Sequence, residues 1–257
     1  MLFSRIRIKK QVKLAIWALV LPVFIGFVEK KQHDRFCRDL HIRLDHNFEH
    51  YFINDEDIKD MLAGHAPGGR LTNLFQERSH AINLRSLEQT LDANPFVQRA
   101  EVSRNLDGGL RVDIEQINPI ARVLWPNGED LYVSQEGKLI PMSPHYTARV
   151  LLVEGPPKWP SVSLTQQPYT ASLLQLLQYI YNDAFWRAQI AQVRVLPDGE
   201  VQLYPQVGRQ TIELGAPEQL ESKFKRLQIF YKKILPAKGW NTYRRINVKY
   251  ENQIICE

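Results

Sequence analysis

Alternation of apolar and polar residues predicts short strands at several places along the chain. Around residues 41–47, Ile42 and Leu44 alternate with charged neighbours, which is typical of a strand with one buried face. The same alternation occurs on both sides of Asp107-Gly108-Gly109. An Asp-Gly turn between two such runs is a strong signal for a hairpin, so we expect one at residues 100–116.

Two helices are expected between the first strand and this hairpin. Asn54 is a capping residue followed by three acidic residues, which are favourable near the positive end of a helix dipole, and Gly64 supplies a stop. The second helix is capped by Asn83, has leucines three and four residues apart, and ends before Pro95. The order strand, helix, helix, strand, strand predicts a small α+β domain at residues 40–117.

Residues 118–257 are predicted to form a strand-rich domain with two helices. The predicted strands lie at residues 121–125, 130–134, 138–142, 148–155, 193–204 and 211–215, and the fifth range is a hairpin turned at Pro197-Asp198-Gly199. One helix has an apolar face made of Leu173, Leu177, Ile180 and Ala184. The other begins at Pro217, which a first helical turn tolerates, and its apolar face consists of Leu220, Phe224, Leu227, Tyr231 and Ile234.

The C-terminal segment alternates once more. Ile246, Val248 and Tyr250 are predicted on a buried face, and the charged or polar residues between them are predicted on a solvent-exposed face. A terminal strand lies either inside a sheet or at its edge. At an edge, its backbone donors and acceptors would be free to pair with another chain.

The N-terminal segment has the composition of a membrane anchor. Residues 1–13 contain five basic residues and no acid, and residues 14–28 are uncharged. Together with residues 11–13 they would form about 27 Å of helix, nearly the thickness of a bilayer core. We therefore expect an uncleaved span at 14–28 with residues 1–13 in the cytoplasm, followed by a polar linker at 29–39. A cleaved signal peptide, for which no small-x-small site is evident, and a buried core helix are the alternatives.

Charge and motifs argue against several functional classes. All of the net charge of +5 comes from residues 1–13, which leaves 28 basic against 28 acidic residues, so a nucleic-acid-binding surface is not expected. No phosphate-binding glycine motif or nucleophile elbow occurs. His46 and His50 have helical spacing but lack the glutamate of a zinc motif, and two free thiols are favoured over a bridge between Cys37 and Cys256. We predict no catalytic, cofactor-binding or metal-binding residue.

Four stretches together resemble the bacterial cell-division protein family FtsQ (DivIB). They are the basic tail and span at 1–28, the segment 84–123 with its NPFV passage, the segment DLYVSQEGKLIP at 130–141, and TIELG with the helix and strand that follow it. The second stretch is similar to a polypeptide-transport-associated (POTRA) domain. Their order and spacing extend the resemblance over nearly the whole chain.

The resemblance implies a fold and a function. The fold is α+β: a single transmembrane helix, a POTRA-like β-α-α-β-β domain at 40–117, and a strand-rich β domain at 118–257. The function is that of a non-enzymatic scaffold without cofactors, anchored in the inner membrane at the division septum, which links early and late division proteins and helps control septal cell-wall synthesis.

The resemblance also implies partners. Other divisome components would contact the POTRA-like domain, and a complex of FtsB-like and FtsL-like bitopic proteins would bind the β domain. The family's main contact is the addition of a partner strand to the last strand, which falls on Tyr250, Glu251, Asn252, Gln253 and Ile254. An envelope transport-associated POTRA adaptor and a membrane-anchored cell-wall enzyme stay open as alternatives.

Overall fold

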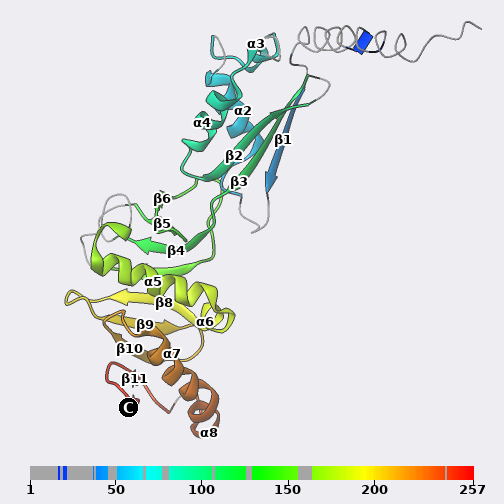
Figure 1. Ribbon diagram of the computed structural model, residues 1–257. Helices are drawn as coiled ribbons and strands as arrows, with labels where there is room; N and C mark the ends of the chain where they lie inside the picture. Colours follow the sequence, from blue (N-terminus) through cyan, green and yellow to red (C-terminus); the bar gives the residue numbers. More distant parts are fainter. Residues whose placement is uncertain are drawn as a thin grey trace, which may run out of the picture. The chain divides into compact units, whose positions relative to one another are not determined.

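The computed structural model describes most of the chain beyond the N-terminal segment (Figure 1). It covers residues 17, 20, 21, 37, 39–45, 51–65, 68–76, 81–105, 108–125, 129–155, 164–240 and 242–257. The expected cytoplasmic tail, most of the expected span and linker, and the pair His46 and His50 lie outside these residues. Among the helices of the described part, none combines the length and the apolar character that crossing a bilayer requires.

Two compact units make up the chain. The first comprises residues 1–45 and 53–116, and the second comprises residues 46–52 and 117–257. Each unit combines a sheet with helices, which confirms the predicted α+β class.

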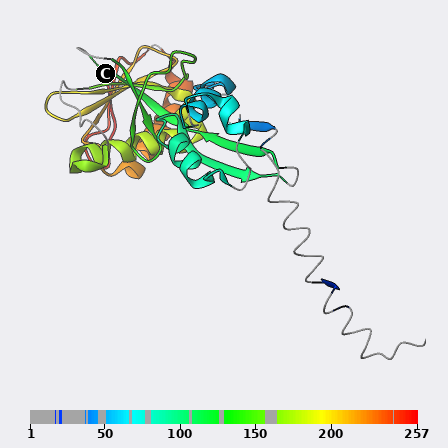
Figure 2. The same ribbon diagram turned by 90° about the horizontal axis from the view of Figure 1, so that it is seen from above.

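The first unit has the predicted order of elements, with one short helix added. Its elements are β1 (Leu40–Asp45), α2 (Asp55–His65), α3 (Leu71–Gln76), α4 (Leu84–Asp92), β2 (Val97–Arg104) and β3 (Leu110–Gln116). The sheet order is β1-β3-β2, with β1 parallel and β2 antiparallel to β3. The blue strand β1 pairs with β3 and lies beside the green part of the sheet in both views (Figures 1 and 2).

Side-chain caps fix the starts of two helices at the residues that the sequence predicts. The Asp57 backbone N–H donates to Asn54 Oδ1, and the Asn54 N–H donates back to Asp57 Oδ2, both at 2.9 Å. Asn83 Oδ1 accepts from the Ser86 N–H at 3.2 Å and so caps α4. These bonds satisfy N–H groups that have no partner inside the helix.

The core of the first unit follows the predicted alternation. In β3 every second residue is buried, and Val97 and Val102 of β2 are only 4% and 5% exposed, so both belong to the core. The buried apolar residues of this core are Cys37, Ile53, Ile58, Leu62, Ile82, Leu87, Leu91, Val97, Ala100, Val102, Leu110, Val112 and Ile114.

Carboxylates of α4 cover the outer edge of β2. The Ala100 N–H donates to Asp92 Oδ1 and the Val102 N–H donates to Glu88 Oε1, both at 2.9 Å. These two N–H groups point away from β3, and they are the groups that another strand would use to pair with β2. The carboxylates therefore close this edge to strand addition.

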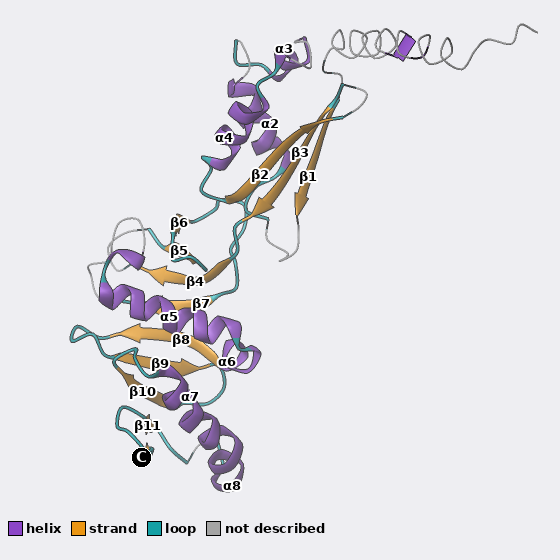
Figure 3. Ribbon diagram, in the orientation of Figure 1, coloured by secondary structure: helices purple, strands orange, loops and turns teal. Residues whose placement is uncertain are grey.

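The second unit is built on a mixed nine-stranded sheet (Figure 3). Its strands are β4 (Pro119–Leu124), β5 (Leu131–Ser134), β6 (Leu139–Pro141), β7 (Leu151–Glu154), β8 (Ile190–Val195), β9 (Val201–Pro205), β10 (Thr211–Gly215), β11 (Arg245–Asn247) and β12 (Ile255–Cys256). They are arranged in the order β12-β11-β10-β9-β8-β7-β4-β5-β6. The helical elements are a 3-10 turn (Leu164–Gln166), α5 (Pro168–Asn182), α6 (Ala184–Gln189), α7 (Leu220–Ile229), a π-helical turn (Phe230–Ile234) and α8 (Leu235–Lys238).

Both helices predicted in this unit differ in detail from the structure. The first ends at Asn182, because extended Asp183 caps a new helix through the Phe185 and Trp186 N–H groups, so Ala184 belongs to α6 and not to the predicted helix. The second begins at Leu220 and not at Pro217, because Gln219 has a left-handed backbone with φ of +50°.

The second predicted helix continues through a π-helical turn. The turn precedes Pro236 in α8, where the proline ring cannot supply an N–H and crowds the carbonyl four residues earlier. The wider π-helical turn relieves this conflict and keeps the chain helical. The predicted apolar face survives, with Phe224, Leu227 and Tyr231 buried.

We expect Glu88→Ala to weaken the protection of the β2 edge. Losing one charge-assisted acceptor at a part-buried N–H should cost about 1 kcal/mol, or about fivefold faster local opening. Hydrogen exchange of the segment 97–104 measures this change. Glu88→Gln keeps an acceptor and should have a smaller effect, while Glu115→Ala on β3 is the control for lost charge. Equal exchange in all three variants would contradict the capping role.

Candidate partner-binding edge

The two C-terminal strands form a hairpin at one end of the large sheet. β11 runs parallel to β10, and β12 turns back antiparallel to β11, with Ile246 opposite Cys256 and Asn247 opposite Ile255. The Arg245 N–H donates to the Glu257 carbonyl at 3.0 Å, and the Glu257 N–H donates to the Arg245 carbonyl at 2.9 Å. β12 is therefore the edge strand on this side.

Hydrogen-bond alternation shows which backbone groups of β12 face outward. Arg245 and Glu257 exchange two bonds, so two residues further along, Asn247 and Ile255 form the next hydrogen-bonded pair. The N–H and C=O of Cys256 then point away from β11. Within the described part of the chain, no strand pairs with that side of β12.

Tyr250 to Ile254 form the connection between β11 and β12 and do not continue a strand. Asn252 has φ of +59°, a left-handed conformation that asparagine tolerates and that reverses the chain. Tyr250 was predicted to share the buried face of Ile246 and Val248, but this prediction is wrong. Those two residues are fully buried, whereas Tyr250 is 56% exposed because the turn rotates it out of the sheet.

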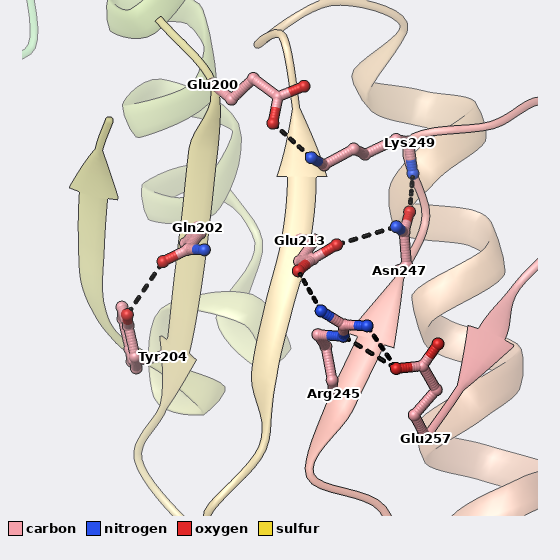
Figure 4. A network of polar contacts seen from close by, with 8 residues as sticks. All are labelled: Glu200, Gln202, Tyr204, Glu213, Arg245, Asn247, Lys249 and Glu257. Atoms are coloured by element: carbon pink, nitrogen blue, oxygen red, sulfur yellow. Dashed lines mark hydrogen bonds and ion pairs between the residues drawn. The ribbon is translucent and has the colours of Figure 1, made fainter. Parts of the chain in front are cut away.

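The hairpin is attached to the sheet by a network of polar side chains (Figure 4). Glu213 of β10 accepts from Asn247 Nδ2 at 2.8 Å and forms an ion pair with Arg245 at 3.6 Å. Arg245 in turn binds Glu257, with Nε at 3.0 Å from Oε2. Lys249 pairs with Glu200, which precedes β9. The network thus links β9, β10, β11 and β12 across their polar face.

The opposite side of the hairpin is attached to the helical layer. Ile246 and Val248 belong to the apolar core, and Arg226 of α7 donates to the Val248 carbonyl at 2.9 Å. Gln219, which precedes α7, donates to Glu251 in the turn at 3.1 Å. The edge strand is therefore supported on both faces of the sheet.

Electrostatics favour the charged forms of the two basic residues in this network. The bond to Glu257, followed by the charges of Glu257 and Glu213, raises the pKa of Arg245. The bond to Glu200 likewise raises the pKa of Lys249, so the Lys249 contribution is complete below the ordinary lysine pKa and is lost only at more alkaline pH. Burial raises the pKa of the Cys256 thiol. Cys256 and Cys37 are both free, as the sequence favours.

The other edge of this sheet offers less backbone to a partner. The Ser134 N–H donates to the Lys138 carbonyl at 2.9 Å, and the alternation then directs the backbone of Leu139 and Pro141 in β6 outward. Pro141 has no N–H to donate. An outward proline on a three-residue strand is a known protection of sheet edges, so β12 is the better acceptor of a strand.

The structure separates the five residues predicted for the partner contact. Ile254 leads directly into β12 and packs on the core, while Tyr250, Glu251, Asn252 and Gln253 lie in the exposed turn. Ile255 and Cys256 form the edge strand itself and are not among the five predicted residues. The polar run Glu251-Asn252-Gln253 between two apolar runs was the available signal for a hairpin.

Comparisons with known proteins agree with this division of the chain. Residues 35–115 match the family described as POTRA-like domain, and residues 118–257 match the family described as FtsQ/DivIB, C-terminal related. A curated relative, the cell division protein FtsQ of Rhodothermus marinus, is 31% identical over 169 residues, which are 63% of this chain. The chain spans 60% of the length of that relative. Since the second family match extends over more than half of the chain, the chain belongs to the FtsQ/DivIB family of cell-division proteins.

Proposed function

We propose that this protein is a non-enzymatic scaffold of the division machinery that binds an FtsB–FtsL-like complex by strand addition at β12. The observation that carries the proposal is the outward backbone of the edge strand β12, with which no strand in the described part of the chain pairs and which contacts on both faces hold in place. Main-chain bonds supply affinity in strand addition, and neighbouring side chains supply selectivity. Family membership supports the choice of a division protein as the partner.

The geometry assigns different roles to the residues at this edge. An added strand would pair with the backbone of Cys256 and, by the same alternation, Ile254. Tyr250 and Ile255 are the large apolar residues exposed beside it, at 56% and 38%. Aromatic side chains often dominate interfaces, so Tyr250 would contribute the main side-chain contact from the turn.

Anchoring in the inner membrane at the septum completes the proposed function. The uncharged run at residues 14–28 would form a single span, with residues 1–13 in the cytoplasm and residues 29–257 outside it. Such an anchor would place the β12 edge among other bitopic division proteins. The POTRA-like unit would contact further components of the division machinery.

The proposed orientation predicts the behaviour of fusion proteins. A reporter that is active only outside the cytoplasm should be active when fused after Glu257. A reporter that is active only in the cytoplasm, fused at the same position, should be silent. The reverse pattern would reject this topology.

Strand addition predicts a strong effect of Cys256→Pro on partner binding. Proline removes an outward N–H without breaking a bond to β11, so the hairpin should persist while affinity falls about tenfold or more. Cys256→Ala is the matched control for the lost side chain and should bind nearly normally. Binding of the purified full-length variants to the FtsB–FtsL-like complex, together with thermal unfolding, measures both effects.

Comparing thermal unfolding with partner binding distinguishes a lost contact from an unfolded variant. A proline variant that unfolds like the wild type and binds at wild-type strength would refute strand addition at β12. Asn252 is an unsuitable position for this test, because its φ of +59° is incompatible with a proline ring.

The polar network predicts that Glu213→Ala loosens the hairpin. The Glu213 side chain is only 14% exposed and binds both Asn247 and Arg245, so its removal should lower the free energy of unfolding by about 1–3 kcal/mol and weaken partner binding. Glu213→Gln keeps an acceptor for Asn247 and should be milder. Glu101→Ala, at an exposed ion pair of the first unit, controls for lost charge. Chemical denaturation and the same binding assay measure the effects, and unchanged values for Glu213→Ala would contradict the supporting role.

A further inference from the structure

The two edges of the three-stranded sheet in the first unit differ in how their outward backbone groups are capped. At β2, the outward N–H groups of Ala100 and Val102 are bonded to carboxylates of α4, and the Arg104 guanidinium donates to the Ile82 carbonyl at 2.5 Å. At β1, the other edge, no such side-chain cap occurs among the described residues. An edge without a cap is a surface for pairing with another strand.

The register identifies the free backbone groups of β1. The Leu110 N–H donates to the Asp39 carbonyl at 2.8 Å, so every second residue from Asp39 directs its backbone toward β3. The residues between them, Leu40, Ile42 and Leu44, direct their N–H and C=O groups outward. Their side chains are half-buried and pack on the core of the unit, so each leaves apolar surface at the edge.

We propose that a second copy of this chain pairs with this edge, β1 against β1 in antiparallel orientation, centred on Ile42. In this register Ile42 lies opposite the Ile42 of the second copy, and Leu40 lies opposite the second copy's Leu44. Every outward backbone group of β1 is then paired. The two three-stranded sheets become one continuous six-stranded sheet.

The sequence of β1 favours a second copy as the occupant. Leu40, Ile42 and Leu44 are apolar and similar in size, so the apolar face of β1 is unchanged by the two-fold rotation about Ile42. The pairing would join these half-buried side chains into one apolar ladder across the new contact. A foreign strand would match this pattern only if it carried the same alternation.

The number of paired residues selects the centre of the pairing. Centring on Arg43 would place this arginine opposite its own copy and would leave Leu40 outside the paired segment. Centring on Ile42 pairs all three outward residues of β1 and places Arg43 opposite His41 and diagonally beside Asp39 of the second copy. The Asp45–Asp39 oppositions of this register fall at the two ends of the paired segment. The register centred on Ile42 is preferred because it satisfies every outward backbone group of β1.

Disulfide cross-linking of the full-length protein in membranes tests the register. Directly opposite residues of a hydrogen-bonded pair have Cα atoms about 5.5 Å apart, which a disulfide can bridge. Ile42→Cys in a background without Cys37 and Cys256 should therefore give a covalent dimer on mild oxidation. In Leu40→Cys alone, the two copies of the new thiol are about 14 Å apart and should cross-link at least tenfold less. The same applies to Leu44→Cys alone.

A mixed experiment keeps the test independent of folding effects at Ile42. Leu40→Cys and Leu44→Cys chains with different tags, expressed together, should form the heterodimer because these residues lie opposite each other. Absence of this heterodimer, or equal cross-linking of all variants, would overturn the proposal. Adducts of another mass, formed in place of the dimer, would assign the edge to a different protein and would also overturn it. None of these results depends on the partner proposed for β12.

Discussion

Unpaired backbone groups at the ends of its sheets are the constraint that organises this protein. Every edge strand exposes N–H and C=O groups that another chain can pair with. The edges of the two sheets differ in how these groups are protected. Carboxylates of Glu88 and Asp92 cap β2, and Pro141 removes a donor from β6. The edges at β1 and β12 have no comparable protection among the described residues, so they are the edges at which we propose that other strands pair.

The edge at β12 depends on a two-residue strand, which is too short to be stable through its own pairing. Its position comes from contacts on either side of the sheet. The buried side chains of Ile246 and Val248 hold β11 against the helical layer, and Glu213 binds Asn247 and Arg245 on the polar face. A short strand held in this way keeps its outward groups in a fixed geometry. Binding to a fixed edge requires less ordering than binding to a flexible tail.

The elements that local chemistry determines could be predicted from the sequence. Asn54 and Asn83 cap helices, and alternation marks the strands of both units, because these signals act between near neighbours in the chain. The start of α7 could not be predicted, since Gln219 adopts a left-handed backbone that nothing in its residue type favours. The position of Ala184 was missed although Asp183 caps α6 through the same kind of local bond. Propensity alone does not settle such boundaries.

At the candidate site, local sequence signals predict the structure less well than elsewhere in the chain. Alternation predicts that Tyr250 continues the buried face of β11, and it holds for Ile246 and Val248. It fails at the next position because Asn252 adopts a left-handed conformation, and the chain reverses to form β12. In the proposed binding mode, this reversal moves the main-chain contact from the predicted residues to Ile254 and Cys256, and it leaves Tyr250 exposed beside that edge. Backbone pairing and side-chain selection would then fall on separate segments of one hairpin. The turn can then vary in sequence without disturbing the pairing of the edge strand.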